Sequence, residues 1–284
     1  MTFRIAQISD SHLSADKPFF VPNFERLAER LGAERYDLVV NSGDVSLNGT
    51  DEIDDLVAAK TLHDAIGLSY RVIAGNHDIG DNQECSEVHG VTDQRRDRFR
   101  SVFGDDWWIH DVPGWRLIGL NALVMGGAMA ASEAQFDFLA GAAATSGGRS
   151  ILLFIHKPLY LASRAEQVVG GRYVNPAARG RLFAALGDRR PAIVASGHVH
   201  QSRDVVLEGI HHCWAPATAF IVPASHQVTV GERFIGFVEH SLRDDGTYQS
   251  RVVPTPELVC NSIADFPDAY GPIDDMMPRV STAE

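Results

Sequence analysis

Residues 1–200 alternate short apolar runs with longer segments in which apolar side chains recur every three or four positions. Short apolar runs are typical of buried strands, and the longer spacing is typical of helices packed on one face. The runs that predict strands are residues 3–8, 36–40, 70–74, 151–155 and 192–195. Helical spacing at residues 24–31 and 56–66 predicts helices between the first three strands. This alternation predicts a sheet flanked by helices.

Turn and cap residues predict further elements in the same stretch. A Pro-Gly pair at residues 113–114 lies between two apolar runs and predicts a hairpin. Ser132 and Gln135 have the spacing of a capping box, which predicts a helix that opens at Ser132. The Asn-Pro pair at residues 175–176 has the residue types of an N-cap and a first helical position, and so predicts another helix.

Beyond residue 200 the helical spacing disappears. Apolar runs separated by Glu-Gly and Asp-Gly turn signals predict antiparallel strands at residues 203–207, 210–214, 233–240 and 248–253. The remaining residues are rich in Pro and Asp, and we expect them to be irregular and partly draped on the body. The sequence therefore predicts one α/β domain over residues 1–253 and a C-terminal tail over residues 254–284.

Polar residues able to bind metal ions follow five of the predicted strands. Polar groups at the carboxyl ends of neighbouring strands meet in one crevice of an open α/β sheet. Glycine precedes three of these groups and allows a sharp turn and a close backbone approach. The groups are Asp10 and His12, Asp44 after Gly43, Asn76, His77 and Asp78 after Gly75, His156, and His198 and His200 after Gly197.

Each group alone has an ordinary interpretation. An Asp-x-His pair is commonly a surface or capping pair, and Asn and Asp favour turns without any ligand. All five in this order resemble the calcineurin-like metallophosphoesterase superfamily, and the resemblance covers residues 10–200. Within that superfamily, the chain resembles the class III cyclic-nucleotide phosphodiesterases and the glycerophosphodiesterases. It resembles them in its length, in its start at the first metal strand and in the segment 214–220.

The resemblance implies a four-layer αββα sandwich, with two mixed β-sheets between helices and a metal site at the carboxyl ends of the strands. It also implies that two metal ions lie side by side and that Asp44 bridges them. One ion would be held by Asp10, His12, Asp44 and His200, and the other by Asp44, Asn76, His156 and His198. His77 would contact the substrate without binding metal, and Asn76 would lie beside the substrate as well as the metal.

The types of these residues agree with that allocation. Imidazole and carboxylate ligands suit Mn, Fe, Zn or Co, and the absence of cysteine from the set argues against a structural zinc site. Two adjacent ions can lower the pKa of a shared water, and we expect the resulting bridging hydroxide to attack phosphorus in line. His77 would stabilise the transition state or protonate the leaving alkoxide.

Lys157 departs from the pattern, because close phosphodiesterase relatives often carry a second histidine after the equivalent of His156. A lysine beside the metals can bind a phosphate oxygen as a point charge. The alternative interpretation is an amine that points to solvent. We therefore include Lys157 among the candidate substrate-binding residues and leave both interpretations open.

Composition limits the partners and the compartment. Hydrophobic residues make up 45% and charged residues 22%, as in ordinary globular proteins. A net charge of −12 disfavours a nucleic acid polymer or an anionic membrane as partner, and no apolar run of about 18 residues predicts a membrane span. Three cysteines without a C-x-x-C pair, and the lack of a signal-peptide pattern, predict a cytoplasmic protein with reduced thiols. The resemblance implies a homo-oligomer.

Three functions compete. The leading one is a phosphodiesterase acting on a 3′,5′-cyclic nucleotide or a glycerophosphodiester. The second is a phosphomonoesterase with the same metals, but the arginines that clamp phosphate in protein phosphatases are absent after Asp44 and after Asp78. The third is a scaffold that has lost its metals, which the complete ligand set and His77 disfavour.

Overall fold

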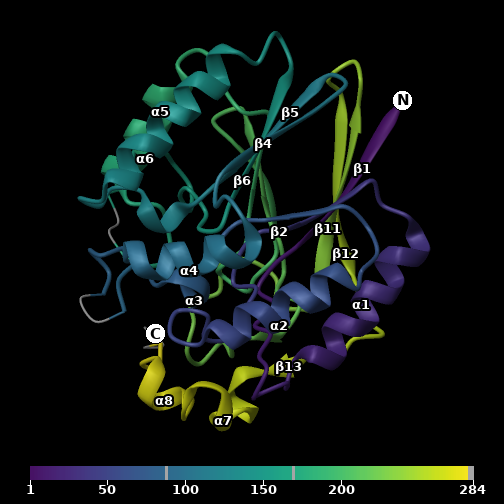
Figure 1. Ribbon diagram of the computed structural model, residues 1–284, viewed down its shortest axis with the longest axis vertical. Coiled ribbons are helices and arrows are strands. Elements are labelled where there is room, and N and C mark those ends of the chain that lie inside the picture. The colour runs from purple at the N-terminus through teal and green to yellow at the C-terminus, as the bar shows by residue number, and fades with distance from the viewer. Residues whose placement is uncertain (87–88, 168–169, 281–284) are drawn as a thin grey trace.

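A computed structural model describes residues 1–86, 89–167 and 170–280. Its strands form two mixed sheets that pack face to face, with a small two-stranded sheet at one end. Helices cover the outer faces, as Figure 1 shows for α5 and α6 on one side of the strands and α1 on the other. The predicted four-layer αββα sandwich is confirmed.

The first sheet has five strands in the order β12-β11-β1-β2-β3. Strands β1, β2 and β3 are parallel to one another, while β11 runs antiparallel to β1 and to β12. The strands are β1 (Thr2–Ile8), β2 (Leu38–Asn41), β3 (Tyr70–Val72), β11 (Gly236–Arg243) and β12 (Tyr248–Pro254).

The second sheet has six strands in the order β4-β5-β6-β7-β9-β8. Its four central strands are parallel, and antiparallel hairpins add β4 and β8 at the edges. The strands are β4 (Trp108–Val112), β5 (Trp115–Leu120), β6 (Ser150–Ile155), β7 (Ile193–Ser196), β8 (Arg203–Leu207) and β9 (Ile210–Trp214).

The helices connect the parallel strands and pack on the outer faces of the two sheets. The longer ones are α1 (Val21–Glu34), α2 (Ile53–Asp64), α4 (Asp93–Phe103), α5 (Ala130–Ala144) and α6 (Pro176–Leu186). Short elements are α3 (Asn76–Ile79), α7 (Pro267–Tyr270) and α8 (Ile273–Met276), with 3-10 turns at Ala122–Val124 and Ile263–Asp265. None of the helices in the described part of the chain has the length and apolar character that a membrane span requires.

Successive side chains along a strand point to opposite faces of the sheet, so each central strand contributes to two layers of hydrophobic core. In β2, Leu38 and Val40 belong to the core between the sheets, whereas Val39 belongs to the core beneath the helices. In β1, Ile5 and Ala6 divide in the same way. Both faces of the central strands are therefore buried, which explains why their sequences are continuous apolar runs.

The structure corrects the predicted start of one helix. Helix α5 begins at Ala130 with Met129 as its N-cap, so Ser132 lies inside the helix and does not cap it. The side chain of Gln135 binds the backbone of Asn121 at the end of β5, accepting from its N–H at 2.7 Å and donating to its carbonyl at 3.0 Å. The capping-box prediction was wrong here because the side chain of Gln135 makes these tertiary hydrogen bonds and does not reach back to the start of the helix.

Other predictions from turns and caps are confirmed. The Pro-Gly pair at residues 113–114 joins β4 and β5, and the side chain of Asn175 accepts a hydrogen bond from Ala177 N at the start of α6. The strand predicted at residues 233–240 is shifted, since β11 spans Gly236–Arg243.

The C-terminal segment, residues 254–280, packs against the body of the protein. Strand β13 (Asn261–Ser262) pairs in parallel with β10 (Phe220–Ile221). Ile263 and Ala269 belong to a small apolar cluster that also contains Phe20 and Phe220. Figure 1 shows this segment in yellow along one end of the molecule, beside α2. Residues 281–284 of the predicted tail lie outside the described residues.

Candidate metal centre

The candidate ligands come together at the carboxyl ends of strands from both sheets. Asp10 and His12 follow β1, Asp44 follows β2, and Asn76 begins α3 just after β3. From the second sheet, His156 follows β6 directly, and His198 and His200 follow β7. The site therefore lies where the two sheets meet. Most of its side chains are buried: Asp10, Asp44 and His156 are at most 2% exposed, while Asn76 and His198 are partly exposed.

The backbone is unusual at these positions. Five candidate ligands have a positive φ, a conformation that residues other than glycine seldom adopt. Strain of this kind is typical of functional sites, where the surrounding structure holds it in place. The five residues and their φ angles are Asp10 at 54°, His12 at 46°, Asp44 at 51°, His198 at 67° and His200 at 54°.

Two of the predicted glycines are needed for close approach. A Cβ on Gly75 would lie 2.2 Å from both the backbone nitrogen and a carboxylate oxygen of Asp44. A Cβ on Gly197 would lie 1.8 Å from the hydroxyl of Ser9 and 2.6 Å from a carboxylate oxygen of Asp10. Any other residue at either position would push a carboxylate out of the cluster.

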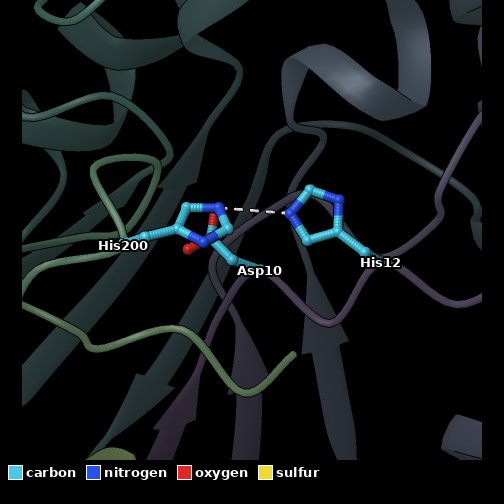
Figure 2. A group of neighbouring side chains, drawn as sticks. All are labelled: Asp10, His12 and His200. Carbon is cyan, nitrogen blue, oxygen red and sulfur yellow. Dashed lines mark hydrogen bonds and ion pairs between the residues drawn. The ribbon is translucent and has the colours of Figure 1, made fainter. Parts of the chain in front are cut away.

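One half of the centre consists of Asp10, His12 and His200. The Nε2 atoms of the two histidines are 3.2 Å apart, and Asp10 Oδ1 is 3.4 Å from His200 Nε2. Figure 2 shows the two rings facing each other, with the Asp10 carboxylate beside His200. Asp10 also accepts hydrogen bonds from the backbone N–H of His198 at 3.0 and 3.1 Å, which fix its orientation.

The other half consists of Asp44, His156 and His198, with Asn76 beside them. Nε2 of His156 lies 3.2 Å from Asp44 Oδ2, 3.2 Å from the amide oxygen of Asn76 and 3.2 Å from His198 Nδ1. Asp44 therefore has one oxygen at this half, and its carboxylate also lies within a group formed with His12 and His77. This places it between the halves.

These distances fit metal ligands. Atoms bound to one ion at about 2.1 Å lie roughly 3.0–3.4 Å from each other in tetrahedral or octahedral geometry. The contacts in both halves fall in that range. Nitrogen and oxygen donors without sulfur match the divalent ions Mn, Fe, Zn and Co. The residues present thus fit two divalent ions, and the allocation of ligands between the two ions stays a prediction.

The four histidines are oriented by hydrogen bonds from the ring nitrogen that faces away from the cluster. A metal-binding histidine ordinarily makes such a bond, which fixes the ring and its tautomer. His156 Nδ1 donates to the Ser42 carbonyl at 2.8 Å, and His198 Nε2 donates to the Gly171 carbonyl at 2.9 Å. The two remaining bonds are His200 Nδ1 to the Phe220 carbonyl at 2.8 Å and His12 Nδ1 to the Tyr270 hydroxyl at 2.5 Å.

The electrostatics divide the four histidines into two pairs. Burial would lower the pKa of His156 and of His200, but Asp44 and Asp10 raise it, to about 9 for His156. Burial, helped by neighbouring histidines, lowers the pKa of His12 and of His198 well below the usual value. Both rings are therefore neutral, which is the form that binds metal. Burial alone would raise the pKa of Asp44, but the adjacent ring of His156 holds it well below its usual value.

Asp78 supports the loops and does not itself bind at the centre. Its carboxylate is fully buried and accepts hydrogen bonds from the backbone N–H groups of Val45, Ser46 and Gly75 and from the Ser46 hydroxyl. It thus joins the loop that carries Asp44 to the loop that carries Asn76. Burial and the nearby Asp44 carboxylate raise the pKa of Asp78 to about 7.

His77 lies at the border between the cluster and the solvent-accessible pocket. Its backbone N–H donates to Asp44 Oδ1 at 2.8 Å, and its Nδ1 lies 3.2 Å from the Leu47 carbonyl. A ring nitrogen lies within 4.8 Å of ligand atoms of His12 and Asp44. The residue also lines a pocket of about 980 Å³ that opens beside the centre.

Lys157 is buried, so its amine does not point to solvent as one of the two interpretations held. Its side chain has no exposed surface, and its ammonium group donates to the carboxylate of Asp81 and to the amide oxygen of Asn82 at 2.8 Å. Asn82 in turn donates to the carbonyl of Leu123 at 2.9 Å. The contact of Lys157 with a substrate phosphate stays a prediction.

Sequence reasoning missed Tyr270, which comes from the segment expected to be irregular. Besides the hydrogen bond to His12, its ring lies 4.9 Å from that of His77, centroid to centroid, and it lines the same pocket. The stretch around this tyrosine is rich in Pro and Asp. It shows neither the spacing of a metal-ligand motif nor the apolar pattern of a helix or strand. No local signal in the sequence could have identified it.

The comparisons with known proteins agree with this geometry. The model of the family described as calcineurin-like phosphoesterase matches residues 3–202. No curated protein matches the chain at a significant level. Similar solved structures include a dimetal phosphatase from Danio rerio, with a TM-score of 0.60 and 14% identity, covering 89% of this chain and 96% of that one.

Two further structures share the fold at similar levels. A purple acid phosphatase from yellow lupin seeds has a TM-score of 0.62 and 16% identity, covering 100% of this chain and 57% of that one. GAP50 of Plasmodium, an anchor in the inner membrane complex, has a TM-score of 0.61 and 16% identity, with 91% of this chain and 86% of that one covered.

Proposed function

Because the chain belongs to the calcineurin-like phosphoesterase family, whose model matches residues 3–202, we propose that it is a binuclear metal-dependent phosphodiesterase. Its substrate would be a small phosphodiester, either a 3′,5′-cyclic nucleotide or a glycerophosphodiester. The family and the clusters of ligands support a metal-dependent hydrolase of phosphate esters. The choice of a diester depends on the pocket beside the metal centre.

The proposed division of labour follows the two halves of the centre. Asp10, His12 and His200 hold one ion and Asn76, His156 and His198 hold the other, with Asp44 between them; these pairings are supported by contacts of 3.2–3.4 Å. When bound, the two ions supply Lewis-acid stabilisation of the phosphate and a nucleophile at neutral pH.

The chain's own residues position the substrate and provide a proton. His77 lies at the mouth of the pocket, next to the cluster but outside both halves. The hydrogen bond from its backbone to Asp44 and the contact of its Nδ1 with the Leu47 carbonyl fix the ring, which leaves Nε2 for the substrate. From there it can donate a proton to the leaving alkoxide.

The lining of the pocket is the observation that favours a diester. Seven carboxylates line it, of which Asp51 and Asp81 are paired with cations outside the lining; the lining itself has one lysine, Lys17, and no arginine among the described residues. The ammonium group of Lys17 is bound to the carbonyl of Ala269. A phosphomonoester carries about −1.5 to −2 charges at neutral pH, more than the single charge of a diester. Repulsion by these carboxylates therefore disfavours the monoester more strongly, and disfavours a polyanionic nucleic acid most.

The decisive experiment compares model substrates with the enzyme reconstituted with Mn²⁺. We expect kcat/KM for bis(p-nitrophenyl) phosphate to exceed that for p-nitrophenyl phosphate. A panel of cyclic nucleotides and glycerophosphodiesters would then identify the natural class. A clear preference for the monoester would contradict the proposal and favour the phosphomonoesterase alternative.

The compartment and the assembly stay predictions. The three cysteines are free thiols, which supports the expectation of a reducing compartment. Size measurement in solution would test the expected homo-oligomer.

A further inference from the structure

We propose that the C-terminal segment completes one half of the metal centre and that Tyr270 is its positioning residue. This inference rests on the proposed binuclear centre. It concerns a part of the chain beyond residue 202, where the match to the family model ends.

The hydrogen bonds that orient the four metal-site histidines divide between the two halves of the centre. The carbonyls of Ser42 and Gly171 orient His156 and His198, and both belong to the part of the chain that the family model covers. His200 and His12 are oriented by Phe220 and Tyr270, which both lie beyond it. The half formed by Asp10, His12 and His200 is thus oriented by C-terminal residues.

Tyr270 differs from the other three partners because it is a side chain. If Nε2 of His12 binds the ion that it would share with His200, as proposed, Nδ1 carries the proton and donates it to the phenol oxygen. A backbone carbonyl is fixed by the strand or loop that holds it, whereas this phenol is only as fixed as the segment beneath it. The orientation of His12 therefore depends on how well that segment is anchored.

The segment is anchored at several points. Asn23 holds Val259 by two hydrogen bonds of 2.8 and 2.9 Å, and β13 pairs with β10, the strand that includes Phe220. Nearer to Tyr270, the ring of Phe266 packs 5.3 Å from that of Phe20, centroid to centroid. The Ala269 carbonyl accepts a hydrogen bond from Lys17 at 3.2 Å. One of these contacts, the pairing of β13 with β10, also binds the strand that orients His200.

Tyr270 also forms part of the substrate pocket. Its ring lies 4.9 Å from that of His77 and 5.9 Å from that of His12, centroid to centroid, so it packs against both the proposed acid and a metal ligand. Ala269, Asp275 and Met276 of the same segment line the pocket as well. The segment is therefore both a support for the metal centre and one wall of the pocket.

The test uses the full chain and three variants. Tyr270→Phe removes the hydroxyl and keeps the ring, and Tyr270→Ala removes both. Tyr36→Phe is the matched control, because its hydroxyl is bound to Glu34 and Glu239 and lies outside the centre. Metal content and metal affinity are measured by competition with a chelator, using Mn²⁺ or Zn²⁺ alone and no substrate.

For Tyr270→Phe we expect one of the two ions to bind about tenfold to a hundredfold more weakly, the effect typical of losing an outer partner of a ligand. Saturating Mn²⁺ should restore kcat with little change in KM. Tyr270→Ala should bind the same ion more weakly by a similar factor. It should also raise KM severalfold, because the Tyr270 ring no longer lines the substrate pocket. Tyr36→Phe should bind both ions as the wild type does.

Two outcomes would overturn the inference. Wild-type affinity of Tyr270→Phe for both ions would show that the hydroxyl does not position His12. Equal weakening of both ions would show that the effect is not confined to one half. If the wild-type protein itself takes up fewer than two ions, the proposed function fails instead, so the two failures are distinguishable.

Discussion

Two clusters of ionisable side chains include residues of the five-stranded sheet or of the loops that follow its strands, and they balance their charges differently. One, the arginine cluster, consists of Arg4, Tyr36, Glu239 and Arg251. In it, the glutamate accepts hydrogen bonds from both guanidinium groups and from the phenol. In the metal centre, by contrast, the two aspartates are bonded to backbone N–H groups and imidazoles, and among the described residues no arginine or lysine pairs with them.

The difference shows what distinguishes a structural ion cluster from a functional one. A carboxylate removed from water needs a positive partner, and the arginine cluster supplies its own. The candidate metal centre gathers carboxylates with imidazoles: its carboxylates raise the pKa of His156 and of His200, against burial, and bound divalent ions would take the place of the protons on these rings. Backbone strain follows the same division: five metal-centre residues have a positive φ, and none of the four members of the arginine cluster does.

The largest effect is expected from Asp44→Ala. Loss of the carboxylate between the halves should leave at most one ion bound and reduce kcat by roughly a thousandfold or more, since two-metal stabilisation is worth several kcal/mol and each 1.4 kcal/mol is tenfold. Elemental analysis and steady-state kinetics would measure both. Glu239→Gln, the matched change in the arginine cluster, should retain both ions. Two ions retained by Asp44→Ala would refute its bridging position.

A smaller loss is expected from His77→Ala. A general acid contributes typically a hundredfold or more, so kcat should fall by about that factor while both ions stay bound. His89 lines the same pocket, and none of the ligand groups includes it, so His89→Ala is the control and should change kcat little. Loss of metal from His77→Ala would instead make His77 a ligand and contradict the proposed division of labour.

The metal centre was largely predictable from sequence because its ligands follow strands. An apolar run followed at once by Asp, His or Asn identifies both the strand and its end, and parallel strand ends meet by topology. Gly75 and Gly197 were recognised for the same reason, since they directly precede the ligands. The structure brings together every predicted ligand, including the pairs that are almost two hundred positions apart in sequence.

What could not be predicted depends on contacts between distant segments that leave no local pattern. Helix α4 is polar along most of its length and buries only Phe99 fully, so its apolar spacing is too weak to detect. The arginine cluster brings together residues from four separate strands and loops. Tyr270 is positioned by a segment whose apolar residues follow neither the helical spacing nor the alternation of a strand. In each case packing decides the structure, and propensity does not.

Gly75→Ala tests the strain that the metal centre requires. The new methyl group would lie 2.2 Å from two atoms of Asp44, and overpacking of this kind typically costs about 1–3 kcal/mol of unfolding free energy. Urea unfolding of the metal-free protein would measure it. Gly180→Ala is the control: Gly180 lies within α6 with open space around it, so alanine should stabilise by about 0.5–1 kcal/mol. Equal stability of the two variants would remove the argument for strain.

The smallest effect is expected in the arginine cluster and depends on pH. Burial would raise the pKa of Glu239, but hydrogen bonds from Arg251, Arg4 and the Tyr36 hydroxyl lower it from 4.5 to about 2. A carboxylate with a depressed pKa in the folded state stabilises the protein above its unfolded pKa and loses that contribution as pH falls through the folded pKa.

The wild type should therefore be more stable than Glu239→Gln at neutral pH, and this advantage should shrink between about pH 4.5 and pH 2. Its size should be on the order of 1–2 kcal/mol, because solvent around Arg251 screens part of the attraction. Taking the difference between the two proteins cancels the acid sensitivity of the metal centre, which both share. A difference in unfolding free energy that is independent of pH over this range would show that the charge of Glu239 contributes nothing, and that the arginine cluster acts by packing alone.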